Sequence, residues 1–112
     1  MKDTEYKKQL EIYEEAALAA SIAANAMVAT NPGVWYPCGF SSVRIRPARG
    51  KFVTVMKDQG IGRTDDFEGG YVFSNPSRNL TQWMDAKIEG SKAFAKVLEK
   101  HGIKAIVQSR MD

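Results

Sequence analysis

The first thirty residues contain neither glycine nor proline, the two residues that most disrupt helices. Alanine, the strongest helix former, is abundant between Ala16 and Ala29. The first stop signal is the run Asn31-Pro32-Gly33. We therefore predict one long helix from Asp3 to Ala29.

This helix carries a heptad-like seam, because its apolar side chains repeat at spacings of four and three residues. The seam is bulky at one end and mostly alanine at the other, and small side chains let two helices approach closely. One interpretation is that the seam assembles a homo-oligomer. The alternative is that it packs on the chain's own sheet. The seam residues are Tyr6, Leu10, Tyr13, Ala17, Ala20, Ala24 and Met27.

The remaining residues alternate between strand and helix signals. We predict an α+β fold in which residues 1–30 form a helical arm and residues 31–112 a core. The core is a β-α-β-α-β unit, a small sheet with helices packed on it. Its predicted elements are a strand at 41–46, a short helix at 51–57, a strand at 70–74, a helix at 81–101 capped by Asn79 or Thr81, and a strand at 103–107.

The segment 51–57 is ambiguous. Its composition suits a strand, and the preceding Pro47–Gly50 has the residues of a hairpin turn. However, Phe52, Val55 and Met56 have helical spacing, and Gly60 followed by Ile61 resembles a helix stop. The pattern favours the helix.

Length and cysteine content limit the class of protein. A chain of 112 residues is long enough for one domain. Its single cysteine, Cys38, rules out an internal disulfide and is typical of a reducing compartment. No run is apolar enough for a signal peptide or a membrane span. We expect a soluble, cytoplasmic protein with no membrane partner.

The sequence offers little to covalent chemistry. Cys38 and His101, the one histidine, are far apart in the chain, and His101 is explained as a cation at a helix end. The acidic run Asp65–Glu68 lacks calcium-loop spacing. After Gly50-Lys51, Phe52 stands where a phosphate loop needs a hydroxyl. We predict no catalytic residues, no metal and no cofactor.

Positive charge is concentrated in one stretch. The net charge is +3, yet residues 40–63 hold six Lys or Arg side chains against Asp58 alone. Arginine outnumbers lysine there, which suits forked recognition of phosphate or carboxylate. A basic face that serves only solubility is the competing interpretation.

Three stretches resemble a family of small uncharacterised proteins from bacteriophage and prophage genomes. They are Arg46–Phe52 (RPARGKF), Gly69–Tyr71 (GGY) and the ending that runs from Gly102 (GIKA) to Asp112 (SRMD). The similarity covers roughly residues 39–112. It implies no activity or site residue, but it implies a setting in which small proteins bind host components, including nucleotide signals of host defence.

We therefore hypothesise a non-enzymatic protein that captures a phosphorylated small ligand, a nucleotide or cyclic-nucleotide-like signal. Nucleic-acid binding through the same basic face and docking to a host protein are the alternatives. In this hypothesis four cations hold phosphates, an aromatic ring stacks on a base, and a further arginine closes the site. These residues are Arg44, Arg46, Arg49 and Lys51, then Tyr71 or Trp35, then Arg78 or Arg110.

Overall fold

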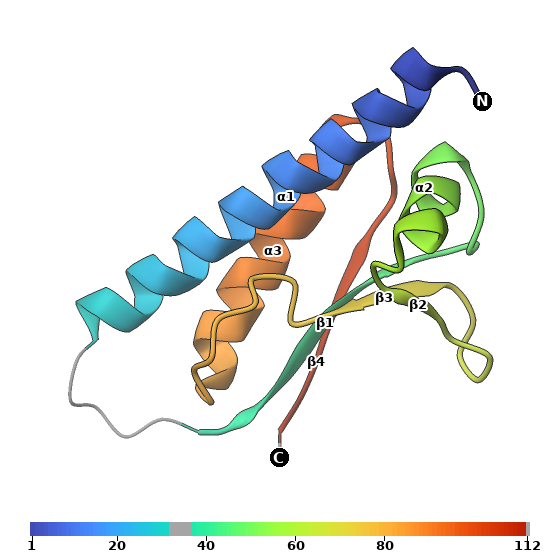
Figure 1. Cartoon of the computed structure of the whole chain (residues 1–112). Helices are drawn as coiled ribbons and strands as arrows, with labels where there is room; N and C mark the ends of the chain where they lie inside the picture. Colours follow the sequence, from blue (N-terminus) through green and yellow to red (C-terminus); the bar gives the residue numbers. More distant parts are fainter. Residues whose placement is uncertain (32–36, 112) are drawn as a thin grey trace.

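The computed structural model describes residues 1–31 and 37–111 and shows the predicted α+β fold (Figure 1). One long helix precedes the strands and helices of the core. A two-residue strand, β2, lies just before the acidic run Asp65–Glu68, where the sequence predicted no strand. The elements are α1 (Asp3–Thr30), β1 (Gly39–Ile45), α2 (Lys51–Gln59), β2 (Arg63–Thr64), β3 (Tyr71–Ser74), α3 (Met84–Lys100) and β4 (Ile106–Met111).

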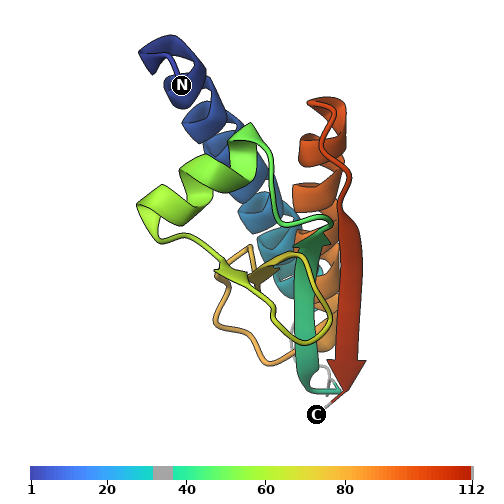
Figure 2. The same ribbon diagram turned by 90° about the vertical axis from the view of Figure 1, so that its right-hand side faces the viewer.

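The sheet has four strands in the order β2-β3-β1-β4, and every neighbouring pair is antiparallel. The strand β1 lies at its centre and pairs with β3 at Val43↔Phe73 and with β4 at Val43↔Val107. Alternate β1 residues, such as Val43 and Ile45, are buried on the side where α3 packs. The side chains between them point to the other side of the sheet. We call this side the open face; in Figure 2 the sheet lies in front of α3, so this face is turned toward the viewer.

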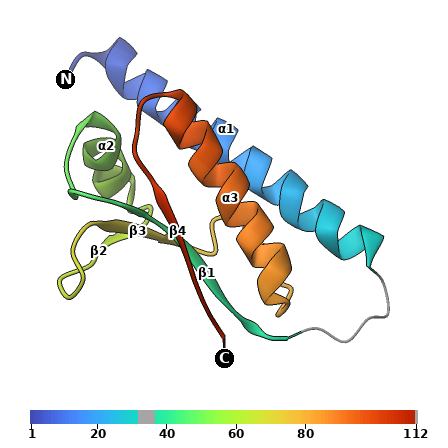
Figure 3. The same cartoon turned by 180° about the vertical axis from the view of Figure 1, so that it is seen from behind.

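The helices α1 and α3 lie side by side on the sheet (Figures 1 and 3). They meet at small residues: Ala20 and Ala24 have no exposed surface. A Cβ atom on Gly90 of α3 would lie 3.2 Å from the carbonyl oxygen of Ala20 and 2.8 Å from the Cβ of Ser77. Glycine is therefore what permits the close approach.

This packing corrects the expected role of the alanine seam. Ala20 and Ala24 are covered by the chain's own α3, so they offer no surface to a second copy. Tyr6, Leu10 and Tyr13 pack against the chain's own core. The rest of the seam, Ala17 and Met27, is half-buried. The buried part of the seam holds this fold together, and homo-oligomer assembly stays a prediction.

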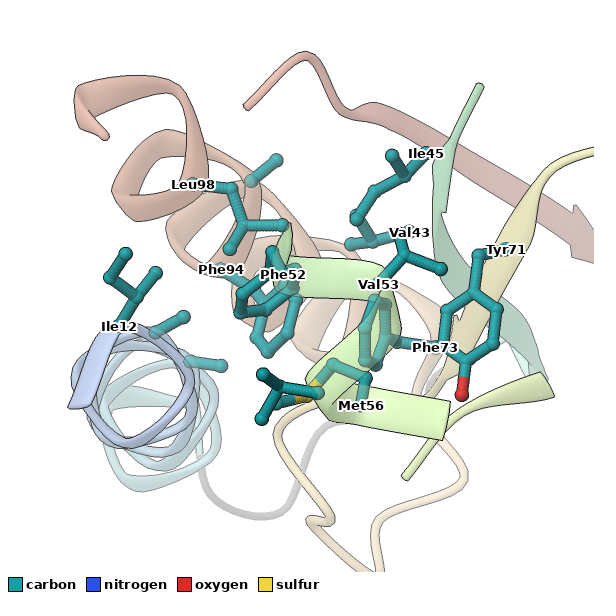
Figure 4. Close-up of a cluster of buried hydrophobic side chains, with 14 residues drawn as sticks. Ile12, Val43, Ile45, Phe52, Val53, Met56, Tyr71, Phe73, Phe94 and Leu98 are labelled. Atoms are coloured by element: carbon teal, nitrogen blue, oxygen red, sulfur yellow. The ribbon is translucent and has the colours of Figure 1, made fainter. Parts of the chain in front are cut away.

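The core centres on Phe73 of β3 (Figure 4). Its ring centroid lies 5.1 Å from that of Phe94 on α3, 5.5 Å from Tyr71 and 6.0 Å from Phe52 on α2. Tyr13 of α1 reaches the same cluster at 6.3 Å. One aromatic cluster therefore joins the sheet to all three helices.

The segment 51–57 is helical, as its spacing indicated, and α2 extends to Gln59. The backbone N–H of Ile61 donates to the carbonyl of Met56 at 2.9 Å, and Gly60 has φ +70° between them. This left-handed glycine ends the helix, as the sequence predicted.

Two predicted boundaries in the last third of the chain are wrong. The helix α3 begins at Met84, because the Asn79 and Thr81 side chains accept backbone N–H groups two residues ahead and form turns before it. The last strand occupies 106–111 rather than 103–107. The N–H of Ile103 donates to the carbonyl of Leu98, which keeps it in the helix stop and delays pairing with β1.

Candidate functional site

The turn between β1 and α2 gathers three of the predicted cations. The N–H of Arg49 donates to the carbonyl of Pro47 at 2.8 Å, and Gly50 takes φ +109° just before α2. Arg46, Arg49 and Lys51 thereby surround the start of this nine-residue helix and line one groove. The sequence predicted this gathering because the three residues are close together in the chain.

The groove has walls from three distant parts of the chain: the first turns of α1, the turn before α2, and the end of α3 with the loop that follows. It is open to solvent and has a volume of about 620 Å³. Buried apolar side chains, including Ile12, Ile45 and Phe52, lie among its lining residues. We call it the basic groove, because its lining includes Lys8, Arg46, Arg49, Lys51, Lys100 and Lys104.

The basic groove holds more positive charge than the whole protein shows. Its lining has six Lys or Arg residues and one carboxylate, that of Glu5, whereas the chain has a net charge of +3. The rest of the protein is therefore slightly acidic. Lys51 Nζ lies 3.5 Å from Glu5, and the Lys51 side chain is 65% exposed, so this pair is weak.

Four of the six cations have no partner of opposite charge. Across residues 1–31 and 37–111, no ion pair or side-chain hydrogen bond engages Lys8, Arg46, Arg49 or Lys104. Four charged side chains thus share one groove without a carboxylate to neutralise them. An anion entering the groove would accept hydrogen bonds from these four side chains without displacing an existing partner.

Glu15 fixes one wall of the groove. Its carboxylate accepts hydrogen bonds from Lys100, at the end of α3, and lies 3.0 Å from His101 Nε2. The hydrogen bond from Lys100, followed by that from His101, lowers the pKa of Glu15. The contact ties the end of α3 to α1. It therefore keeps the loop that carries Lys104 beside the N-terminal part of α1.

Arg44 does not join this group, although the sequence placed it there. Its side chain is only 6% exposed, and Nη1 lies 2.8 Å from Asp65 and Nη2 3.3 Å from Glu68. Nε donates to Gln108 at 2.9 Å, and Nη1 also donates to the carbonyl of Gly69. Arg44 is fully engaged in holding the loop between β2 and β3 to the sheet.

Asp65 is the main partner of Arg44 in that loop. The hydrogen bond from Arg44, with those from the backbone N–H groups of Phe67 and Glu68, lowers the pKa of Asp65 to about 2. The acidic run therefore acts as an internal counter-charge. No cluster of three or more His, Cys, Asp or Glu residues able to hold a metal ion occurs in the part of the chain that the structure describes.

Gly70 explains how neighbouring arginines reach different places. It has φ +86°, and a Cβ atom there would lie 2.6 Å from the carbonyl oxygen of Ile45. The same atom would lie 2.9 Å from Cγ of Arg46 and 3.2 Å from Cγ of Arg44. Both stems pass over this glycine. The head of Arg44 then lines a groove on the open face, whereas Arg46 lines the basic groove.

The predicted stacking residues do not line the basic groove. Tyr71 is 1% exposed, its hydroxyl donates to the carbonyl of Ile61, and burial raises its pKa. Because its ring is inside the core, stacking of a ligand base on Tyr71 is wrong. Trp35 lies outside the described residues.

The two arginines expected to close the site are elsewhere. Arg78 is exposed, has φ +57° in the segment before α3, and lines neither groove. Arg110 lies on β4 and lines the groove on the open face. Neither is among the residues of the basic groove.

Three cations of the basic groove were missed by the sequence analysis: Lys8, Lys100 and Lys104. Lys100 lies in the last turn of α3, where a positive charge is favourable on local grounds alone. Lys8 and Lys104 carry no local signal, because each reaches the groove only through the packing of α1 beside α3. Only their tertiary placement brings them to one groove.

No family model, curated protein or solved structure matches this chain. Within residues 1–31 and 37–111, none of the helices combines the length and the apolar character needed to cross a bilayer.

Proposed function

We propose that this protein binds a phosphate-bearing small ligand, a nucleotide or a cyclic-nucleotide-like molecule, in the basic groove. The observation that carries the proposal is the set of four cations without a carboxylate partner: Lys8, Arg46, Arg49 and Lys104. Charged hydrogen bonds to an anion are about twice as strong as neutral ones, and arginine binds phosphate through two donors at once.

The groove suits a ligand with both a charged and an uncharged part. Its lining combines six cations with apolar residues that include Ile12, Ile45 and Phe52. A volume of about 620 Å³ is in the range of small-molecule and cofactor sites. Phosphate would meet the cations while a base or sugar covers the apolar residues.

The lining supports binding without covalent chemistry. None of the described residues that form it carries a hydroxyl or thiol group able to attack a bound ligand. His101, the groove's one imidazole, is held by Glu15.

The test is a titration of the protein with adenosine triphosphate, with a cyclic dinucleotide and with inorganic pyrophosphate, followed by calorimetry. We expect at least one probe to bind, and the variant Arg46→Ala/Arg49→Ala to bind it about a hundredfold more weakly, since each charged hydrogen bond contributes about 1.5 kcal/mol or more. Arg78→Ala is the matched control, because it removes an exposed arginine outside the groove. Equal affinities in the double variant and the control would refute the proposal.

Nucleic acid is the second candidate, and the same six cations favour it. Salt separates the two. Binding to nucleic acid weakens steeply with salt, in proportion to the phosphates contacted. A small ligand with few phosphates gives a shallower dependence and raises the melting temperature by mass action. If the affinity for a short single-stranded oligonucleotide falls steeply with salt concentration, and the small probes do not bind, the ligand of the basic groove is nucleic acid.

A further inference from the structure

A second groove lies on the open face of the sheet, with residues from β1, β2, β4 and α3 among its lining. Its volume is about 720 Å³, and it shares no residue with the basic groove. We call it the open-face groove. Apart from Arg44 and its two carboxylate partners, its lining has cations, polar side chains and one aromatic ring, among them Phe40, Ser42, Arg63, Ser74, Asn75, Lys87, Gln108 and Arg110.

Lys87 is the unusual member of this groove. It comes from α3, is only 8% exposed, and its Nζ donates to the carbonyl of Gly39 at 2.9 Å. No carboxylate lies within ion-pair distance of it in residues 1–31 and 37–111. Buried charges are normally paired with an opposite charge. Lys87 is more than nine-tenths buried, has no carboxylate partner among the described residues and lines a groove, which points to an anionic ligand.

Phe40 adds an aromatic surface at the same place. Its ring is half-exposed, at 50%, on the central strand. Lys87 Nζ and Arg110 Cζ each lie 5.5 Å from the ring centroid, and Arg110 stands opposite Phe40 in the β1–β4 register. An aromatic ring and a guanidinium plane are both surfaces on which nucleobases stack.

The carboxylates in this groove do not cancel its charge. Asp65 and Glu68 are both bound to Arg44, as described above. Arg63, Lys87 and Arg110 are the other cations of the lining, and none has a carboxylate partner among the described residues. The groove thus offers three cations, and two of them, Lys87 and Arg110, lie beside the ring of Phe40.

We propose that the open-face groove is a separate binding site for a nucleotide. The phosphate is held by Lys87 and Arg110, and the base lies against Phe40. The polar side chains from neighbouring strands, Ser42, Ser74 and Gln108, supply donors and acceptors for the base edge. The nucleotide is either free or part of a single strand, and the shared chemistry is a phosphate beside a planar ring. This inference does not rest on the function proposed for the basic groove.

The experiment uses the Arg46→Ala/Arg49→Ala protein, so that loss of binding at the basic groove does not affect the result. Its probes are thymidine monophosphate, a fluorescein-labelled single-stranded oligothymidylate, and inorganic phosphate, measured by calorimetry or anisotropy. We expect nucleotide probes to bind more tightly than phosphate. Adding Phe40→Ala should weaken nucleotide binding at least about fivefold, because a stacking surface is lost.

Two controls match these changes. Phe67→Ala removes a fully exposed ring that lies outside the groove, and Arg78→Ala removes an exposed arginine outside it. Arg110→Ala should weaken both nucleotide and phosphate binding, whereas Phe40→Ala should weaken nucleotide binding more than phosphate binding.

The outcomes separate the two sources of the ligand. If the monophosphate binds as tightly as the oligomer does, counted per nucleotide, the ligand is a free nucleotide. If only the oligomer binds tightly, the ligand is a single strand. No binding of any nucleotide probe, or equal effects of Phe40→Ala and Phe67→Ala, overturns the proposal.

Discussion

Substituting Ala20 by glutamate distinguishes a seam that holds this fold from a seam that joins two copies. Ala20 has no exposed surface, and a Cβ atom on Gly90 of α3 would lie only 3.2 Å from its backbone carbonyl oxygen, so the two helices are in close contact here. The longer side chain overpacks the helix crossing, at a cost of about 1–3 kcal/mol. Burial of a carboxyl group without a partner adds about 1–3 kcal/mol more.

The expected total for Ala20→Glu is therefore about 2–6 kcal/mol, a large part of the roughly 5–15 kcal/mol that stabilises a typical domain. For a chain of this length even the lower value lowers the melting temperature by roughly 8 °C, at about 4 °C per kcal/mol. Urea unfolding followed by circular dichroism measures the first quantity, and a thermal melt measures the second.

Leu18→Glu is the matched control, because Leu18 lies on the same helix but is 62% exposed. Its free energy of unfolding should stay within about 0.5 kcal/mol of the wild-type value. Light scattering should give the same molar mass for all three proteins. An Ala20→Glu protein that keeps its stability but loses half its mass would show that the seam is an interface between copies, and would refute the packing described above.

Two further predictions concern single contacts. The Ser41 hydroxyl donates to Ser91 Oγ at 2.8 Å inside the protein, and Ser91→Ala should lower the free energy of unfolding in urea by about 1–2 kcal/mol. The double variant Ser41→Ala/Ser91→Ala should cost less than the two single changes added together, because no hydroxyl is then left unpaired. Simple additivity of the two single changes would contradict this. Asp65 has a pKa of about 2 in the folded protein against 3.8 when unperturbed. Its ion pair therefore stabilises the fold above pH 4, and this contribution is lost as the pH falls from about 4 to about 2. The melting temperature of Asp65→Asn should decline less over that interval than that of the wild type, and parallel curves would contradict the assignment.

Local signals predicted the helices more successfully than the ends of the strands. The long first helix follows from thirty residues without glycine or proline, and α2 follows from the spacing of Phe52, Val55 and Met56. The position of β4 was missed because it depends on pairing with β1, a strand more than sixty residues away in the chain. No local pattern shows that Ile103 stays bound to the end of α3.

The candidate site divides in the same way. Arg46, Arg49 and Lys51 were predicted together because a turn keeps sequence neighbours close in space. Lys8 and Lys104 were not, because helix packing brings them to the groove. Arg44 was misplaced because strand alternation gives the face of a side chain but not its partners.

Tyr71 was misplaced for a related reason. An exposed aromatic residue and a core residue look alike in a short strand, and here three consecutive β3 residues, Tyr71, Val72 and Phe73, are all buried. Buried and exposed residues do not alternate along this strand, so alternation could not identify the side chains that point into the core. Burial on both faces comes from the packing of the rest of the chain.

The distant origin of the basic groove's walls has a consequence for the empty protein. Folding brings four cations, which have no carboxylate partner in the described part of the chain, from three separate segments into one groove, where they repel one another. Dissolved salt weakens that repulsion within a Debye length of about 10 Å at 0.1 M. Moderate ionic strength should therefore make the unliganded fold harder to melt, and removing one of these charges by mutation should reproduce part of the gain.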